Sequence, residues 1–94
     1  MLRSMTERVA CVTGAGGTIG RAICRRLAKE GWQVVLLDRD EGRAKSLAAE
    51  LGGLFLQTDV ADEAQVERAF AEVADVYGRL DALVNNAAIA DPSS

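Results

Sequence analysis

The chain has no histidine, and its 94 residues include only two cysteines, one tryptophan and one tyrosine. Without histidine, a Ser-His-Asp or Cys-His catalytic unit is excluded and a zinc site is not expected. Cys11 and Cys24 both lie in apolar segments, where we expect buried thiols and no disulfide framework. The composition therefore predicts neither a metal site nor a nucleophilic triad.

Long hydrophobic runs are also missing. Unbroken apolar runs such as 34–37 stay far below the roughly 20 residues that a membrane-spanning helix needs. The first residues, 1–6, are too short and too polar for the apolar core of a secretion signal. We therefore expect no membrane partner and a cytoplasmic location.

Basic residues do not dominate the charge. Lys plus Arg number 11 and Asp plus Glu number 14, so the formal net charge is -3, the opposite of the usual balance in nucleic-acid-binding domains. We expect no nucleic-acid partner. A hydrophobic content of 49% is typical of globular proteins, and the length suits a single domain over 1–94 with a frayed tail at 90–94.

Strand and helix patterns alternate along the chain. Short apolar runs predict four strands, at 8–13, 33–38, 53–58 and 80–85. Apolar residues at helical spacing predict three helices between them. The apolar stripe of the first helix is Ile19, Ala22, Ile23, Leu27 and Ala28.

The predicted helices carry recognisable ends. Gly31 follows the first helix as a stop signal. Asp40 is placed to cap the second helix. Asp62 and Gln65 have the spacing of a capping box at the start of the third, and Gly78 terminates it. The order βαβαβαβ with right-handed crossovers predicts an α/β, Rossmann-type doubly wound parallel sheet of strand order 3-2-1-4.

Glycines cluster where the first predicted strand meets the first helix. Such a loop lets the backbone turn sharply and approach a phosphate, and the helix N-terminus favours its negative charge. The alternative is a glycine-rich turn with no ligand, which the position between a strand and a helix disfavours. The residues predicted to cradle a pyrophosphate are Gly14, Gly16, Gly17, Thr18, Ile19 and Gly20.

The second predicted strand ends in Asp38, about 20 residues after this loop. A carboxylate there hydrogen-bonds the ribose of the adenosine half and repels a 2′-phosphate, so it favours NAD over NADP as the cofactor. Arg39 follows directly, and its guanidinium could instead meet a 2′-phosphate. We favour a solvated turn residue as the interpretation of Arg39.

Together these residues resemble the short-chain dehydrogenases/reductases. The resemblance runs roughly over 6–89 and rests on four matches in order: the glycine loop, Asp38, the pair Asp59 and Val60, and the segment 77–88. That last segment ends in Asn-Asn-Ala-Ala, similar to the Asn-Asn-Ala-Gly motif of the family. Four motifs at the family's spacing are far more specific than a glycine triplet alone.

The resemblance implies roles for the later motifs. Asp59 and Val60 are expected to border the adenine, with the Asp59 carboxylate accepting from its amino group. Asn86 is expected on the inner wall of the cleft, with Ala87 and Ala88 close to a ribose. Asn residues at this strand end also tie neighbouring loops together, and the two interpretations are compatible.

Two positions depart from the family pattern. Thr18 stands where the standard branch has glycine, and Gly17 fits the spacing of an extended branch that contains sugar-nucleotide epimerases and dehydratases. The match at 77–88 points to the standard branch of alcohol and ketone oxidoreductases. Ala88 replaces the usual glycine, and its methyl group would crowd the cofactor or require a small backbone shift.

The serine, tyrosine and lysine that catalyse the family's reaction have no counterpart. Tyr77 has no lysine four residues later and reads as a packing residue. We therefore expect the NAD-binding, N-terminal portion of an alcohol or ketone oxidoreductase, inactive alone. Its fourth strand would be an unprotected edge that self-associates or pairs with a missing C-terminal half. The alternatives are a non-catalytic nucleotide-binding module and a fragment of an epimerase or dehydratase.

Overall fold

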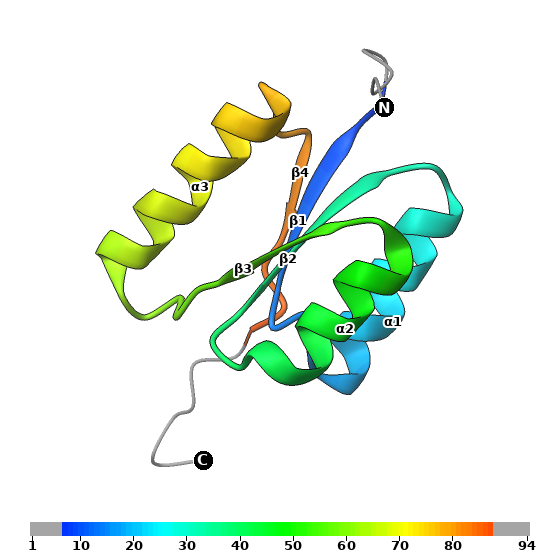
Figure 1. Cartoon of the computed structure of the whole chain (residues 1–94), viewed down its shortest axis with the longest axis horizontal. Coiled ribbons are helices and arrows are strands. Elements are labelled where there is room, and N and C mark those ends of the chain that lie inside the picture. The colour runs from blue at the N-terminus through cyan, green and yellow to red at the C-terminus, as the bar shows by residue number, and fades with distance from the viewer. Residues whose placement is uncertain (1–6, 88–94) are drawn as a thin grey trace.

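The computed structural model describes residues 7–87 as a parallel four-stranded sheet between two helical layers (Figure 1). The elements follow one another as β1 (Val9–Thr13), α1 (Thr18–Lys29), β2 (Gln33–Asp38), α2 (Glu41–Leu51), β3 (Leu54–Gln57), α3 (Glu63–Tyr77) and β4 (Ala82–Val84). The predicted alternation of strands and helices is therefore confirmed. The tail expected at 90–94 lies outside the described residues.

The strands are ordered β3-β2-β1-β4, and every pairing is parallel. This is the predicted order. The chain steps outward from β1 to β3 and then crosses to the other side of β1 for β4. Helices α1 and α2 cover one face of the sheet and α3 covers the other, which makes the fold a doubly wound, Rossmann-type arrangement (Figure 1).

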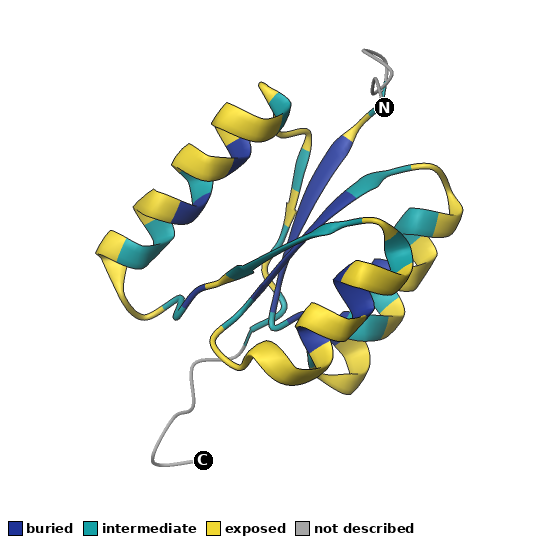
Figure 2. Ribbon diagram, viewed as in Figure 1, coloured by how far each residue is buried: buried dark blue, intermediate teal, exposed yellow. Residues whose placement is uncertain are grey.

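Each face of the sheet has its own apolar core, and the central strands β1 and β2 are the most buried part (Figure 2). Val12, Val34 and Leu36 pack under α1 and α2, whereas Val35 and Leu37 pack under α3. This explains why the first two strands are apolar on both faces at every position except their ends, Thr13, Gln33 and Asp38: both of their faces are covered.

The cysteines lie in different cores. Cys11 belongs to the cluster under α3, and Cys24 belongs to the cluster under α1 and α2. Both are free and fully buried. Burial raises the pKa of each thiol to about 11, so both stay protonated and unreactive near neutral pH. The expected plain buried thiols are what the structure contains.

The apolar stripe predicted for α1 is wrong in its first turn. Ile19 is 67% exposed and Ala22 is also exposed, while Gly20 and Cys24 are the buried positions. The cause is the close contact of Gly20 with the Gly14 carbonyl, which sets the side of the helix that faces the protein. Ile19 is thereby turned to solvent.

Of the two predicted helix N-caps, the structure forms the side-chain cap of α3 but not that of α2. The Asp62 carboxylate accepts from the N–H groups of Ala64 at 3.0 Å and Gln65 at 3.3 Å, as a capping residue should. The reciprocal half of the box is wrong, because Gln65 Oε1 accepts from the Asp59 N–H instead. Asp40 occupies the N-cap of α2 but its side chain makes no capping hydrogen bond.

Three strands are shorter than predicted, and β4 differs most. It pairs with β1 only from Ala82 to Val84. Just before it, Asp81 donates its N–H to the Val9 carbonyl at 2.8 Å, and its carboxylate accepts the Val9 N–H at 2.8 Å. The Asp81 side chain thus takes the place of a backbone carbonyl as the acceptor for the Val9 N–H. The regular pairing of β1 with β4 therefore starts one residue later, at Ala10 and Ala82.

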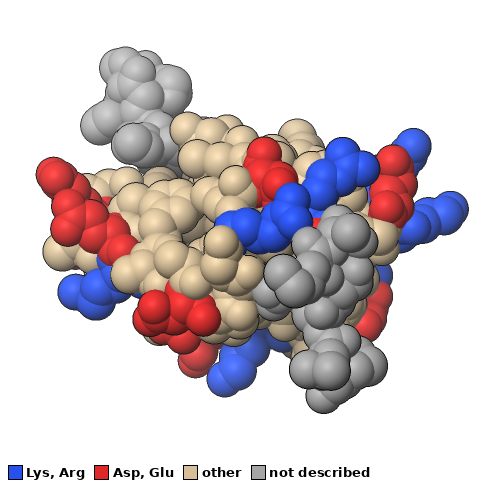
Figure 3. All heavy atoms as spheres, turned by 90° about the horizontal axis from the view of Figure 1, so that it is seen from above, with Lys and Arg blue, Asp and Glu red and all other residues tan. Residues whose placement is uncertain are grey.

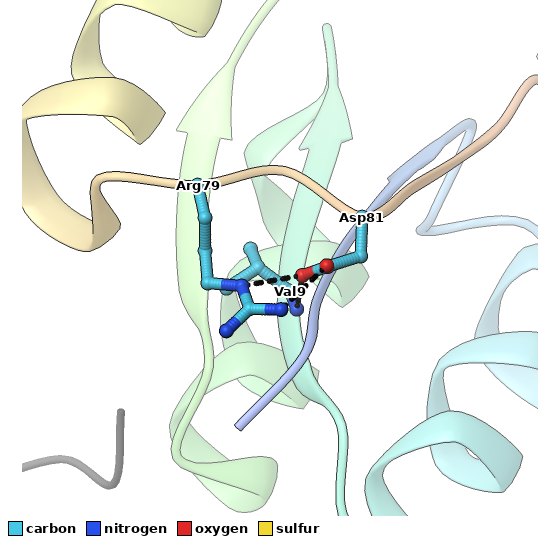
Figure 4. Close-up of polar contacts among 3 residues, drawn as sticks. All are labelled: Val9, Arg79 and Asp81. Atoms are coloured by element: carbon cyan, nitrogen blue, oxygen red, sulfur yellow. Dashed lines mark hydrogen bonds and ion pairs between the residues drawn. The ribbon is translucent and has the colours of Figure 1, made fainter. Parts of the chain in front are cut away.

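Arg79 completes this junction (Figure 4). Its Nε and a terminal nitrogen donate to the two Asp81 oxygens at 2.8 and 2.7 Å. The Arg79 guanidinium and then the Val9 N–H hold the pKa of Asp81 below its usual value. The group formed by Val9, Arg79 and Asp81 is called the β1–β4 clamp below.

No helix within residues 7–87 is both long and apolar enough to cross a membrane. Lys and Arg side chains are interspersed with Asp and Glu side chains over the face drawn in Figure 3. That face is therefore not a continuous basic surface of the kind that binds a phosphate backbone.

Candidate functional site

A cleft of about 680 Å³ opens beyond the carboxyl ends of the strands. Its walls come from the loops that follow all four strands and from the first turn of α2. The lining residues are Gly14, Gly16, Gly17, Asp38, Arg39, Asp40, Gly42, Arg43, Thr58, Asp59, Val60, Ala61, Asn86 and Ala87. The cleft lies where the chain order reverses around β1, the position at which open α/β sheets bind ligands.

The glycine loop has a backbone that larger residues would not permit. Gly14 has a φ of +62°, and a Cβ there would lie 3.0 Å from the Ala87 Cα. A Cβ on Gly20 would lie 2.1 Å from the Gly14 carbonyl oxygen. The loop is thereby folded tightly onto the first turn of α1, which brings the helix N-terminus to the cleft.

Within residues 7–87, no side chain caps the N-terminus of α1. Gly17 is the N-cap residue, there is no side-chain capping bond, and the first turn contains no acid. The N–H groups of Thr18, Ile19 and Gly20 have no acceptor within the helix. Thr18, Ile19 and Gly20 do not themselves line the cleft, whereas the N-cap residue Gly17 does. What these three residues offer a ligand is backbone N–H groups and the positive end of the helix dipole.

Asp38 is bonded to the glycine loop as well as facing the cleft. Its Oδ2 accepts from the Gly16 N–H at 2.8 Å, and its Oδ1 accepts from the Asp40 N–H at 2.9 Å. A Cβ on Gly16 would approach Oδ2 to 3.0 Å, so glycine suits this contact. Each carboxylate oxygen keeps a further lone pair for a ligand hydroxyl.

The Asp59 loop forms the next wall. The Thr58 N–H donates to the Asp38 carbonyl at 2.9 Å and thereby joins the ends of β2 and β3. Asp59 Oδ1 accepts from the Ala61 N–H at 2.9 Å, which shapes a tight turn. Asp59 and Val60 both line the cleft.

The Asn-Asn-Ala segment closes the remaining side. Thr13 Oγ1 accepts a hydrogen bond from the Ala87 N–H at 2.9 Å. The same hydroxyl donates to Asn85 Oδ1 at 3.2 Å. Asn86 Nδ2 donates to the Gly14 carbonyl at 3.3 Å. Asn85 and Asn86 therefore tie two loops together, and Asn86 also lines the cleft. Ala88, the last predicted site residue, lies outside the described residues.

Five lining residues were missed by sequence reasoning, namely Asp40, Gly42, Arg43, Thr58 and Ala61, and Arg43 is the one that adds a positive charge. It lies in the first turn of α2 and lines the cleft together with Arg39. A signal for it exists, because the first turn of a helix that follows a strand faces the carboxyl edge of the sheet. The cleft thus contains two arginines beside the carboxylates of Asp38, Asp40 and Asp59.

Tyr77 is remote from the cleft. Its ring packs in the core under α3, and its hydroxyl accepts from Gln33 Nε2 at 3.0 Å. Gln33 begins β2, whereas the cleft lies beyond the other end of that strand. Within residues 7–87 no three or more Asp, Glu or Cys side chains come together in a group that could hold a metal ion.

Comparisons with known proteins agree with this geometry. The family described as short chain dehydrogenase matches residues 8–94. The chain is 44% identical to a 3beta-hydroxysteroid dehydrogenase of Mediterraneibacter gnavus over 92 residues, which are 93% of this chain and 33% of that protein. The chain spans about a third of the length of the curated relatives that it matches.

Solved structures show the same fold. A 3-ketoacyl-(acyl-carrier-protein) reductase from Brucella melitensis, complexed with NADH, matches with a TM-score of 0.85 and 39% identity over 92% of this chain and 36% of its own. YwfH, an NADPH-dependent reductase involved in bacilysin biosynthesis, matches with a TM-score of 0.85 and 28% identity over 93% of this chain and 40% of its own.

Proposed function

Because the chain belongs to the short-chain dehydrogenase family, we propose that its cleft binds a nicotinamide dinucleotide. The observation that carries this proposal is the uncapped N-terminus of α1, folded by the glycine loop into the same cleft as Asp38. The N–H groups at that helix end, which have no acceptor within the helix, suit the pyrophosphate. The open lone pairs of Asp38 suit the hydroxyls of the adenosine ribose.

The other walls suit the adenine. Val60 and Ala61 offer apolar contacts beside the Asp59 carboxylate, which would accept from the exocyclic amino group. Asn86 and Ala87 would border the ribose on the far side of the pyrophosphate. Ala88 is kept in the proposed site as the next residue of that segment.

We propose NAD as the preferred cofactor. Asp38 and Asp40 repel a 2′-phosphate, and a like charge in a binding site costs enough to change affinity at least about tenfold. Arg39 and Arg43 oppose this effect, and they favour NADP as the alternative. Among the solved relatives, the Brucella melitensis reductase is complexed with NADH, whereas YwfH is NADPH-dependent.

Calorimetry on the whole 94-residue chain with NAD and with NADP tests both points. NAD is expected to bind about tenfold more tightly, and Asp38→Asn is expected to remove most of that preference. Asp75→Asn removes the same charge from α3 and serves as the control. Equal or tighter binding of NADP would show that the attraction of Arg39 and Arg43 for the 2′-phosphate outweighs the repulsion by the carboxylates. Failure to bind either cofactor would refute the cleft as a dinucleotide site.

We further propose that a protein of the relatives' full length containing this chain would oxidise an alcohol or reduce a ketone with this cofactor, and that this chain alone is inactive. Within residues 7–87 no tyrosine or lysine lines the cleft, so no such side chain there can exchange a proton with the substrate. A non-catalytic nucleotide-binding module remains the second candidate. NADH formation by the isolated chain with any alcohol, in proportion to protein, would overturn the proposed inactivity.

A further inference from the structure

A second hollow lies on the outer side of the molecule, between α1 and α2. It measures about 370 Å³ and is lined by Arg21, Arg25, Gly42, Arg43, Ser46, Leu47 and Glu50. Helices α1 and α2 contact one another along this side and lie together in Figure 1. This α1–α2 groove meets the dinucleotide cleft at Gly42 and Arg43, which line both.

The groove concentrates positive charge in a protein that is negative overall. Arg21 and Arg25 are spaced one helical turn apart on α1, and Arg43 approaches the same space from α2. Glu50 is the one acid in the lining, and it forms an ion pair with Arg25. Both side chains of that pair are about half exposed, where ion pairs are weak and readily exchange partners.

Arg21 carries the unsatisfied buried donor of the group, its Nε. Its Nε is buried and has no hydrogen-bond acceptor among the described residues. A buried donor on a charged group costs free energy when it makes no hydrogen bond. An acceptor bound in the groove would recover that free energy. Nothing in the proposed dinucleotide site uses Arg21, because this residue does not line that cleft.

We propose that the α1–α2 groove binds a phosphate group. Arginine guanidinium groups match phosphate oxygens by forming paired, charge-assisted hydrogen bonds. Arg21 and Arg25 would hold the anion from one helix and Arg43 from the other, with the Ser46 hydroxyl as a neutral donor. The site is separate from the pyrophosphate position at the glycine loop.

The phosphate has two possible sources with the same chemistry. It is either a free or independently carried phosphate, or the 2′-phosphate of NADP, which would extend from the ribose at Asp38 past Gly42 and Arg43. Titration of the whole chain with inorganic phosphate, followed by NMR of the backbone amides, distinguishes them when it is repeated with saturating NAD and with saturating NADP. Sodium chloride at equal ionic strength corrects for screening.

Saturable shifts at Arg25 and Ser46 that persist with NAD are the expected result. Shifts confined to Gly17 and Thr18 would place the ion at the glycine loop and overturn the proposal. Disappearance of the groove shifts when NAD or NADP is present would also overturn a separate site. So would a response to phosphate no greater than the response to chloride.

Two substitutions of opposite sign sharpen the test. Arg21→Gln is expected to weaken phosphate binding about tenfold, because hydrogen bonds to a charged acceptor are among the strong ones. Glu50→Gln removes the repelling carboxylate and is expected to tighten binding. Lys29→Gln, a matched loss of charge on α1 outside the groove, should leave the affinity unchanged.

Circular dichroism checks that each variant keeps its helices. If Arg21→Gln fails to fold, Ser46→Ala and Glu50→Gln still decide the matter, since Ser46 and Glu50 are exposed on α2. Equal phosphate affinity in the wild type, Ser46→Ala and Glu50→Gln would refute the groove as the binding site.

Discussion

At the scale of single residues, glycine is needed at the positions of the loop for different structural reasons. Gly14 is required by its positive φ, Gly16 by its contact with Asp38, and Gly20 by its contact with the Gly14 carbonyl. Gly42 has none of these constraints, because a Cβ there would meet nothing within 4 Å. The sequence pattern treats loop glycines alike, but only the structure shows which atom each one accommodates.

Gly20→Ala is expected to destabilise the fold by at least about 2 kcal/mol, because the added methyl group would overlap a backbone oxygen that cannot rotate away. For a domain of this size, that corresponds to a fall in the melting temperature of roughly 10 °C. Thermal unfolding followed by circular dichroism measures it.

The matched control is Gly42→Ala, the same substitution at an unconstrained helical position. It is expected to raise stability by about 0.5–1 kcal/mol, since alanine loses less backbone entropy than glycine in a helix. If both variants melted at the wild-type temperature, the close approach of Gly20 to Gly14 would be contradicted.

Site residues were predictable where a single local property decides their position. The carboxyl ends of parallel strands meet at one edge, so Asp38, Asp59 and Asn86 could be assigned to one cleft from the strand pattern. Arg43 was missed because its place depends on the start and direction of α2. The bond from Asp38 to the Gly16 N–H depends on tertiary geometry that no spacing encodes.

At the scale of elements, order and type were predictable and boundaries were not. Apolar runs in alternation with amphipathic segments specify strands and helices, and the handedness of crossovers limits their order. The ends are decided by tertiary contacts. The Asp81 carboxylate accepts the Val9 N–H in place of a backbone carbonyl of β4. The Gly53 N–H donates to the Ala48 carbonyl at the end of α2, so β3 does not begin at Gly53.

The β1–β4 clamp predicts a pH dependence. Arg79 and the Val9 N–H lower the pKa of Asp81 in the folded state. A lowered folded pKa contributes stability that is present above the ordinary value of 3.8 and lost as the pH falls through the folded value. Asp81→Asn should therefore lower the melting temperature near neutral pH, and this difference should shrink in acid below the ordinary value.

A double-mutant cycle provides the control for the clamp. Arg79→Leu should destabilise the wild type more than it destabilises Asp81→Asn, because the carboxylate that Arg79 contacts is then no longer charged. Additive effects of the two substitutions, or a melting difference for Asp81→Asn that does not change with pH, would show that the clamp adds nothing to the pairing of β1 with β4.

At the scale of the whole molecule, one edge of the sheet remains apolar and uncovered. Among the described residues β4 pairs only with β1, so its other side has no strand partner. Leu83 is 50% exposed, and Val76 and Leu80 are also exposed. Leu83 pairs in register with Cys11 and so lies on the α3 side of the sheet. Exposed strand edges with apolar side chains are templates for association.

We therefore expect the 94-residue chain to self-associate at micromolar concentration through β4, and Leu83→Lys to reduce this association. A lysine on the edge strand adds a charge that is costly to bury between two copies. Ala71→Lys adds the same charge on the exposed side of α3, away from the edge, and should leave association unchanged. Light scattering with analytical ultracentrifugation measures the mass of each species. A monomer at all concentrations, or equal loss of association in both variants, would exclude β4 as the contact.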